Sequence, residues 1–269
     1  MLRIGAVSYL NTKPLIHGLP ERLGEAGRLS LDLPSRLARD LRRGHLDVAL
    51  IPSIEFFRGQ GYQIVSDAVI ACRGPVWSVR LLSRVPIPKI TRLALDEGSR
   101  TSAAMVRVLL HEMHGLHPET VSLPIDAHPE SVDADAVLLI GDRAMHPARG
   151  VYEEIWDLGD RWCRWTELPF VFAMWVARAG INVEGLAEML ERSRDAGLEQ
   201  LETIAAAEAG SHGLTREDLH RYFAENLHFR MGAGERSGLK SFQSKAAALG
   251  LIAPAPIPST HTADPQNFS

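Results

Sequence analysis

The sequence predicts an α/β fold of two lobes that are joined by two crossover strands and enclose a ligand cleft. Apolar strand-like runs alternate with helix-like segments through the first half of the chain, and several of these runs end in short polar junctions. A proline-rich stretch, 85–89, then leads into a new strand. The long apolar run at 170–177 can carry the chain back to the first lobe.

These boundaries predict a discontinuous first lobe, residues 1–86 and 176–252, and a second lobe at residues 87–175. The helix-like segments after Gly180 should cover the first lobe. The repeated order of strand, helix and strand predicts largely parallel sheets. The last stretch, 253–269, is rich in proline and polar residues and is predicted to be disordered.

The composition excludes several classes of protein. Of the 269 residues, 45% are hydrophobic and 23% are charged, which is ordinary for a globular protein. The net charge of −4 and the absence of a basic run argue against a nucleic-acid partner. We see no signal peptide and no apolar run of the ~20 residues that a membrane helix needs, so we expect a cytoplasmic protein that does not bind a membrane.

Neither cysteine nor histidine patterns predict a metal site. Cys72 and Cys163 lack the spacing of zinc ligands, and we expect both to be reduced thiols. His111, His114 and His117 are spaced by three residues, whereas a zinc-protease helix places its histidines four apart. We therefore predict no metal.

The first polar junction, 3–15, is the stretch around which the first lobe is organised. Apolar residues up to Val7 suit a buried strand, and Ser8 and Asn11 can cap a helix or hold a ligand where Pro14 permits a first helical turn. A polar turn at the carboxyl end of a strand is where open α/β sheets bind ligands. The alternative is a strand, a cap and a helix with no ligand.

Further polar junctions carry serine residues. The apolar strand at 46–51 runs into Ser53. After a glycine-proline turn, Ser78 is expected inside a strand, where its side chain either points outward or faces the cleft. Both interpretations of Ser78 are open at this point.

The second lobe contains the best candidate for an anion site. Residues 97–102 open a long helix, so backbone N–H groups, hydroxyl groups and the Arg100 guanidinium face whatever lies in front of it. The alternative is an ordinary Ser/Thr cap with a solvated arginine. A third junction, 141–144, follows a buried strand at 135–140.

The two-lobed arrangement resembles a type 2 periplasmic-binding-protein fold. Six stretches together also resemble the motifs of the chorismate dehydratase family, which acts first in the futalosine route to menaquinone. The stretches are 5–15, 47–53, 74–79, 96–102, 140–144 and 165–173. The resemblance covers nearly the whole chain, up to about residue 251.

The resemblance implies that the chain removes water from chorismate to give 3-[(1-carboxyvinyl)oxy]benzoate, in the cytoplasm and without a cofactor. The expected partner is this small-molecule substrate, and the oligomeric state is left open. Asn11 and Ser78 are the expected catalytic residues. The expected substrate-binding residues are Ser8, Tyr9, Ser53, Ser99, Arg100, Thr101, Ser102, Gly141, Asp142 and Arg143.

A strong protein base is not evident in the motifs. They contain no histidine, and Glu55, Glu97 and Asp142 are candidates that can equally cap helices or pair with arginine. Our hypothesis is that the enolpyruvyl carboxylate of the substrate removes the C3 proton.

Two other functions are compatible with the same fold. One is a non-catalytic solute-binding protein, against which the missing signal peptide argues. The other is the sister enzyme of the route, which makes 1,4-dihydroxy-6-naphthoate.

Overall fold

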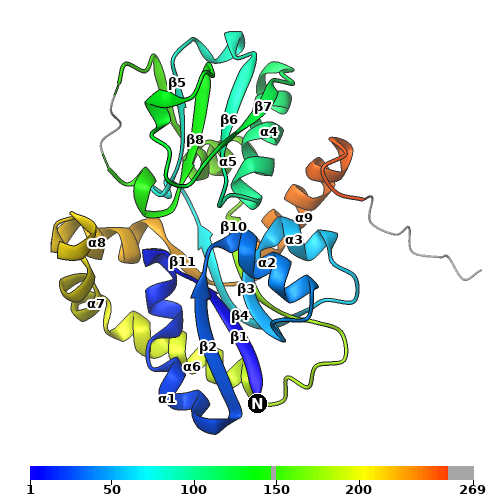
Figure 1. Cartoon of the computed structure of the whole chain (residues 1–269), viewed down its shortest axis with the longest axis vertical. Coiled ribbons are helices and arrows are strands. Elements are labelled where there is room, and N and C mark those ends of the chain that lie inside the picture. The colour runs from blue at the N-terminus through cyan, green and yellow to red at the C-terminus, as the bar shows by residue number, and fades with distance from the viewer. Residues whose placement is uncertain (147–149, 254–269) are drawn as a thin grey trace, which may run out of the picture.

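The computed structural model describes residues 1–146 and 150–253, and within them the strands form two mixed β-sheets (Figure 1). The first sheet has six strands in the order β11-β4-β10-β3-β1-β2, and the second has five in the order β7-β6-β8-β5-β9. We call the elements around these sheets the first lobe and the second lobe. They follow one another along the long axis of the molecule. The predicted tail, 253–269, lies outside the described residues except for Ala253.

The first sheet combines parallel and antiparallel strands. Its strands are β1 (Leu2–Val7), β2 (Gly27–Asp32), β3 (Val48–Pro52), β4 (Gln63–Cys72), β10 (Phe170–Ala177) and β11 (His228–Arg230). β1 runs parallel to β2 and β3, whereas β10 inserts antiparallel between β3 and β4. The sheet is therefore mixed rather than largely parallel, because the strand that returns from the second lobe runs the opposite way.

Helices cover the first sheet and form the N-terminal junction. They are η1 (Leu10–Ile16), α1 (Leu19–Leu23), η2 (Gly24–Ala26), α2 (Pro34–Arg42), α3 (Ser53–Arg58), α6 (Leu186–Glu199), α7 (Leu201–Glu208), η6 (Gly210–His212), α8 (Arg216–Arg221), η7 (Tyr222–Asn226) and α9 (Ala233–Ala248). α2 begins at Pro34, whose fixed φ suits a first helical turn, and buries Leu37, Ala38 and Leu41. None of the described helices is both long and apolar enough to cross a membrane.

The second lobe is built from a continuous part of the chain. Its elements are β5 (Val79–Ser83), η3 (Ile87–Lys89), β6 (Arg92–Asp96), α4 (Thr101–His114), β7 (Glu119–Leu123), η4 (Pro129–Ser131), β8 (Ala136–Ile140), η5 (Gly141–Ala144), β9 (Glu154–Asp157) and α5 (Leu158–Thr166). β6 is parallel to β7 and β8, and β5 is antiparallel to β8 and β9.

The chain changes sheets earlier than the sequence predicts. It leaves the first sheet at Cys72 and enters the second at Val79, whereas we expected the crossover at 85–89. The proline-rich stretch forms η3, a turn inside the second lobe. β10 likewise belongs wholly to the first sheet, because it pairs with β3 and β4 from Phe170 onward, whereas we expected the second lobe to extend to residue 175.

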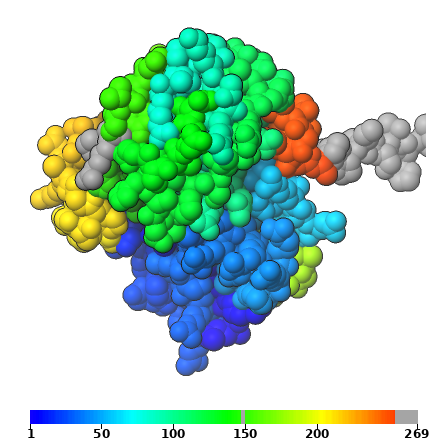
Figure 2. Space-filling model, turned by 45° about the horizontal axis from the view of Figure 1, so that its top comes forward, coloured from blue at the N-terminus to red at the C-terminus, as the bar shows by residue number. Residues whose placement is uncertain are grey.

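The two lobes share one apolar core. A continuous cluster of buried side chains includes residues of both sheets, and a smaller cluster lies within the second lobe. At the second crossover, the Trp162 ring of α5 lies 5.0 Å from that of Phe170 on β10 and 5.9 Å from that of Phe242 on α9. In Figure 2 the cyan-to-green second lobe lies directly against the blue first lobe and the yellow helices.

Close packing of α6 against η1 sets the position of the N-terminal junction. A Cβ atom on Gly197 of α6 would lie 1.9 Å from the Pro14 carbonyl oxygen of η1, so only glycine allows this approach. By contrast, a Cβ on Gly210 would meet no heavy atom within 4 Å.

We predict that Gly197→Ala lowers the free energy of unfolding by about 3 kcal/mol, because the methyl group would force backbone apart. Gly210→Ala is the matched control and should change it by less than about 0.5 kcal/mol. Urea unfolding followed by far-ultraviolet circular dichroism measures both values. Equal values for the two variants would contradict the predicted contact.

Candidate ligand-binding cleft

A pocket opens between the lobes at the ends of the first-sheet strands. It encloses about 530 Å³ of empty space, part of which is open to solvent at its mouth. It is lined by Val7, Tyr9, Asn11, Pro34, Pro52, Ile70, Val76, Ser78, Val79, Gly98, Ser99, Arg100, Thr101, Ser102, Ile140, Gly141, Phe172 and Ala173. The lining combines apolar side chains with hydroxyl, amide and guanidinium donors.

The N-terminal junction links the first lobe to the second. The Leu10 N–H donates to the Asp142 carboxylate at 3.0 Å, and burial raises the pKa of that carboxyl group. The Tyr9 ring lies against Gly141, where a Cβ would approach the ring to 2.9 Å, and Gly141 has a positive φ of 64°. Tyr9 thus occupies the space that a side chain at this glycine would fill.

The Tyr9 hydroxyl reaches into the second lobe. It is buried without a hydrogen-bond partner among the described residues, and it would lie 2.8 Å from a Cβ on Gly98. Burial raises the pKa of Tyr9 well above its usual range, and the nearby Asp96 and Asp142 carboxylates act in the same direction. Tyr9 is therefore a neutral phenol at this lobe interface.

The start of α4 contacts the start of α3 beside the pocket. The Thr101 hydroxyl accepts the Ile54 N–H and lies 3.3 Å from the Ser53 hydroxyl, which donates to the Val171 carbonyl at 2.8 Å. Ser99 accepts the Ala103 N–H at 3.0 Å as a helix cap. The N-terminal ends of two helices thus meet beside the pocket, and both favour a negative charge.

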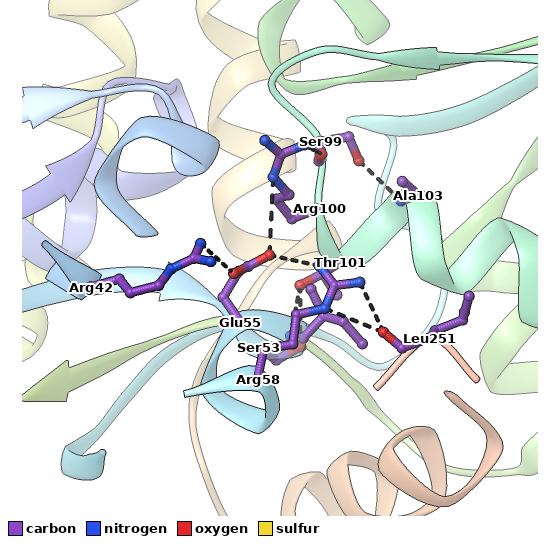
Figure 3. A network of polar contacts seen from close by, with 10 residues as sticks. Arg42, Ser53, Glu55, Arg58, Ser99, Arg100, Thr101, Ala103 and Leu251 are labelled. Carbon is purple, nitrogen blue, oxygen red and sulfur yellow. Dashed lines mark hydrogen bonds and ion pairs between the residues drawn. The ribbon is translucent and has the colours of Figure 1, made fainter. Parts of the chain in front are cut away.

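Three arginines surround one buried carboxylate at this place (Figure 3). Glu55 on α3 lies 2.7 Å from the Arg58 guanidinium, 3.4 Å from that of Arg42 and 4.0 Å from that of Arg100. Three positive charges face one negative charge, so the cluster retains an excess of positive charge. Arg100 has the longest of these contacts and also lines the pocket. Its guanidinium is therefore placed to pair with a ligand carboxylate instead of with Glu55.

Ser78 lies in a tight turn just before β5, rather than inside the strand. Its N–H donates to the Val76 carbonyl at 2.7 Å across Trp77, whose φ is +61°. Such a γ-turn is rare and strained for a non-glycine residue. The Asp157 carboxylate stabilises it by accepting the N–H groups of Val76 and Trp77. The 1% exposed Ser78 side chain lines the pocket, which favours the cleft-facing interpretation.

Tyr222 is a site residue that the sequence analysis missed. Its buried hydroxyl donates to the Ser78 hydroxyl at 2.8 Å. Burial raises the pKa of Tyr222 well above its usual range, against the smaller effect of its hydrogen bond with Ser78. Ser78, one of the two residues expected to be catalytic, thus contacts a phenol from the C-terminal part of the chain, where no motif marked it.

The structure brings eight of the predicted site residues into the pocket lining and leaves four outside it. The eight are Tyr9, Asn11, Ser78, Ser99, Arg100, Thr101, Ser102 and Gly141. The four are Ser8, Ser53, Asp142 and Arg143.

Each of the four has a structural reason for its position. Ser8 is exposed because side chains alternate along the extended chain, so its neighbour Tyr9 faces the cleft. Ser53 and Asp142 are engaged in the interlobe hydrogen bonds described above. Arg143 turns away within η5, donates to the carbonyls of Ile125 and Ala127, and lies 3.5 Å from Asp96.

The described residues contain no group of three or more His, Cys, Asp or Glu side chains that could hold a metal ion. The pocket donors are hydroxyl, amide, backbone N–H and guanidinium groups, which suit an anionic organic ligand rather than a cation.

Comparison with solved structures defines the class of fold. A protein of known crystal structure from Archaeoglobus fulgidus matches with a TM-score of 0.77 and 19% identity, over 93% of this chain and 98% of that chain. The periplasmic aliphatic sulphonate binding protein SsuA from Escherichia coli matches with a TM-score of 0.60 and 16% identity, over 94% of each chain. The chain has a periplasmic-binding-protein-like fold, as predicted.

The sequence comparisons then give the family. The chain belongs to the menaquinone biosynthesis family, whose model matches residues 2–248. It is similar to the chorismate dehydratase of Thermus thermophilus, with 33% identity over 270 residues, covering 92% of this chain and 95% of that relative. The family resemblance that the six motifs predict is therefore confirmed.

We predict that Gly141→Ala lowers the free energy of unfolding by about 3 kcal/mol, because the methyl group meets the Tyr9 ring in a left-handed backbone conformation. In a Tyr9→Ala background the loss should fall to about 1 kcal/mol. Gly180→Ala is the control, since Gly180 has a φ of +77° and open space around it. An equal loss for Gly141→Ala and Gly180→Ala in urea unfolding would contradict the Tyr9 contact.

Proposed function

We propose that this protein is a chorismate dehydratase, a carbon–oxygen lyase that removes water from chorismate in the cytoplasm. The observation that carries the proposal is the similarity to the Thermus thermophilus chorismate dehydratase over nearly the full length of both chains. The pocket supports it independently, because its donors suit a small molecule with carboxylate and hydroxyl groups.

The start of α4 is the proposed site for one substrate carboxylate. Backbone N–H groups at a helix start, the hydroxyl of Ser102 and the guanidinium of Arg100 can all donate to it. The excess positive charge around Glu55 attracts the dianionic substrate to the same place. Asn11 and Ser78 are proposed to contact the reacting part of the ring.

The proposed reaction is a redox-neutral elimination. The C3–H bond breaks, its electron pair becomes the new ring double bond, and the C4–O bond breaks as the ring becomes aromatic. The C3 proton passes to a base, and the departing hydroxide takes up a proton that restores this base, so that one molecule of water leaves in total. The site has to orient the substrate, exclude water and donate hydrogen bonds to the departing oxygen.

We infer that the enolpyruvyl carboxylate of chorismate is this base. The three candidate protein bases each have another contact: Glu55 pairs with Arg58, Glu97 accepts the Ile125 N–H, and Asp142 accepts the Leu10 N–H. None of the three lines the pocket within the described part of the chain. These contacts support a substrate-assisted mechanism.

The first test is to incubate the purified, chelator-treated protein with chorismate and to follow chorismate loss and product mass. We expect catalytic formation of a product that is lighter by one water, at a rate that chelator does not change. Chorismate bound without turnover would favour a solute-binding protein. No binding at all would favour the sister enzyme that makes 1,4-dihydroxy-6-naphthoate.

A second test addresses the two proposed catalytic residues. Asn11→Ala and Ser78→Ala should each lower kcat by about 10²-fold, the loss expected for one oriented hydrogen bond in the transition state. Steady-state kinetics with chorismate measures the effect, and circular dichroism checks the fold. Wild-type kinetics in a folded variant would remove that residue from the catalytic set.

The third test concerns the base. Glu97→Gln keeps the shape of the side chain and removes its charge, and we expect kcat within about threefold of wild type, because a substrate carboxylate takes the proton. Asp142→Asn keeps an acceptor for the Leu10 N–H, and its kcat should likewise persist. Loss of turnover in a variant that still binds chorismate would point to a protein base instead.

A further inference from the structure

Tyr222 lies at the start of an unusual helical turn. α8 continues into a π-helix, η7, in which the Leu227 N–H donates to the Tyr222 carbonyl at 3.2 Å. π-helical turns are rare and occur frequently at functional sites. The turn places a fully buried phenol against the pocket wall.

The same turn is attached to the first crossover. The Asn226 amide donates to the Pro75 carbonyl at 3.0 Å, and the Tyr222 ring packs edge to face on Trp77 at 5.7 Å. Trp77 is the strained residue of the γ-turn that presents Ser78. η7 therefore contacts the backbone before the turn, the side chain of Trp77 at its centre and the side chain of Ser78 at its end.

The direction of the Tyr222 hydrogen bond determines what Ser78 can do. A hydroxyl has one proton to donate, and that of Tyr222 is donated to the Ser78 oxygen. Burial keeps Tyr222 protonated. An acceptor site of Ser78 is thereby filled, so the Ser78 proton is free to point into the pocket that its side chain lines.

We propose that Tyr222 is a positioning residue that directs the Ser78 hydroxyl proton toward the departing C4 hydroxyl group of the substrate. This inference rests on the proposed dehydratase function. A hydroxyl that itself accepts a hydrogen bond is a stronger donor, because hydrogen bonds in a chain polarise one another. Tyr222 thus acts through Ser78 and does not touch the substrate.

The test is the Tyr222→Phe variant, which keeps the ring and its contact with Trp77 and removes only the hydroxyl. We expect kcat to fall about tenfold, with KM for chorismate within about twofold of wild type, because the lost orientation matters most when the C–O bond breaks. In a Ser78→Ala background, the same substitution should change kcat by less than about twofold.

Tyr62→Phe is the matched control, because Tyr62 is a partly buried tyrosine that does not line this pocket. Its kinetics should equal those of wild type. Thermal unfolding of each variant separates a loss of stability from a loss of turnover at temperatures well below the transition.

Three results would overturn the inference. Wild-type kcat in Tyr222→Phe would show that the hydroxyl only satisfies a buried polar group. An equally large loss in the Ser78→Ala background would show that Tyr222 does not act through Ser78. A wild-type protein that fails to dehydrate chorismate would overturn the proposed function and this inference together, and that measurement is made first.

Discussion

The contact between the N-terminal junction and η5 determines the shape of the cleft. One backbone N–H, that of Leu10, and one ring, that of Tyr9, connect the first lobe to the strand end of the second. Both contacts require the backbone at the start of η5 to lie close to the N-terminal junction. Gly141 allows this approach because it has no Cβ and adopts a positive φ. Residues of both lobes line the pocket beside these contacts, and Tyr9 is one of them.

The pocket lining provides fixed dipoles and the Arg100 guanidinium rather than carboxylate or imidazole side chains. Helix starts and hydroxyl groups lie beside the pocket. The partly buried carboxylates of Asp142 and Asp157 accept backbone N–H groups and do not line it. Dipoles that are already oriented need not reorganise when charge moves in a reaction. This arrangement suits chemistry in which the substrate supplies its own reactive groups and the protein controls their surroundings.

Local sequence patterns predicted the strands, the polar junctions and the α4 start well, because each depends on neighbouring residues. The strand that ends at Val7 and the Ser99 cap are local features of this kind. The patterns failed where the outcome depends on distant contacts. The γ-turn at Trp77 is stabilised by Asp157, and Tyr222 joins the site through a π-helical turn, neither of which has a local signature. The sheet membership of β5 likewise depends on pairing with β8 and β9.

The position of β10 has a consequence for how the molecule is assembled. In the first sheet, β3 and β4 do not pair with each other; both pair with β10, which lies between them. β10 follows the entire second lobe in the sequence. Because the chain is synthesised from its N-terminus, β3 and β4 have unpaired edges while the residues from β5 to α5 are being synthesised. The second lobe is continuous and can complete its own sheet during that interval. The lobe that is translated first is therefore the lobe that is finished last.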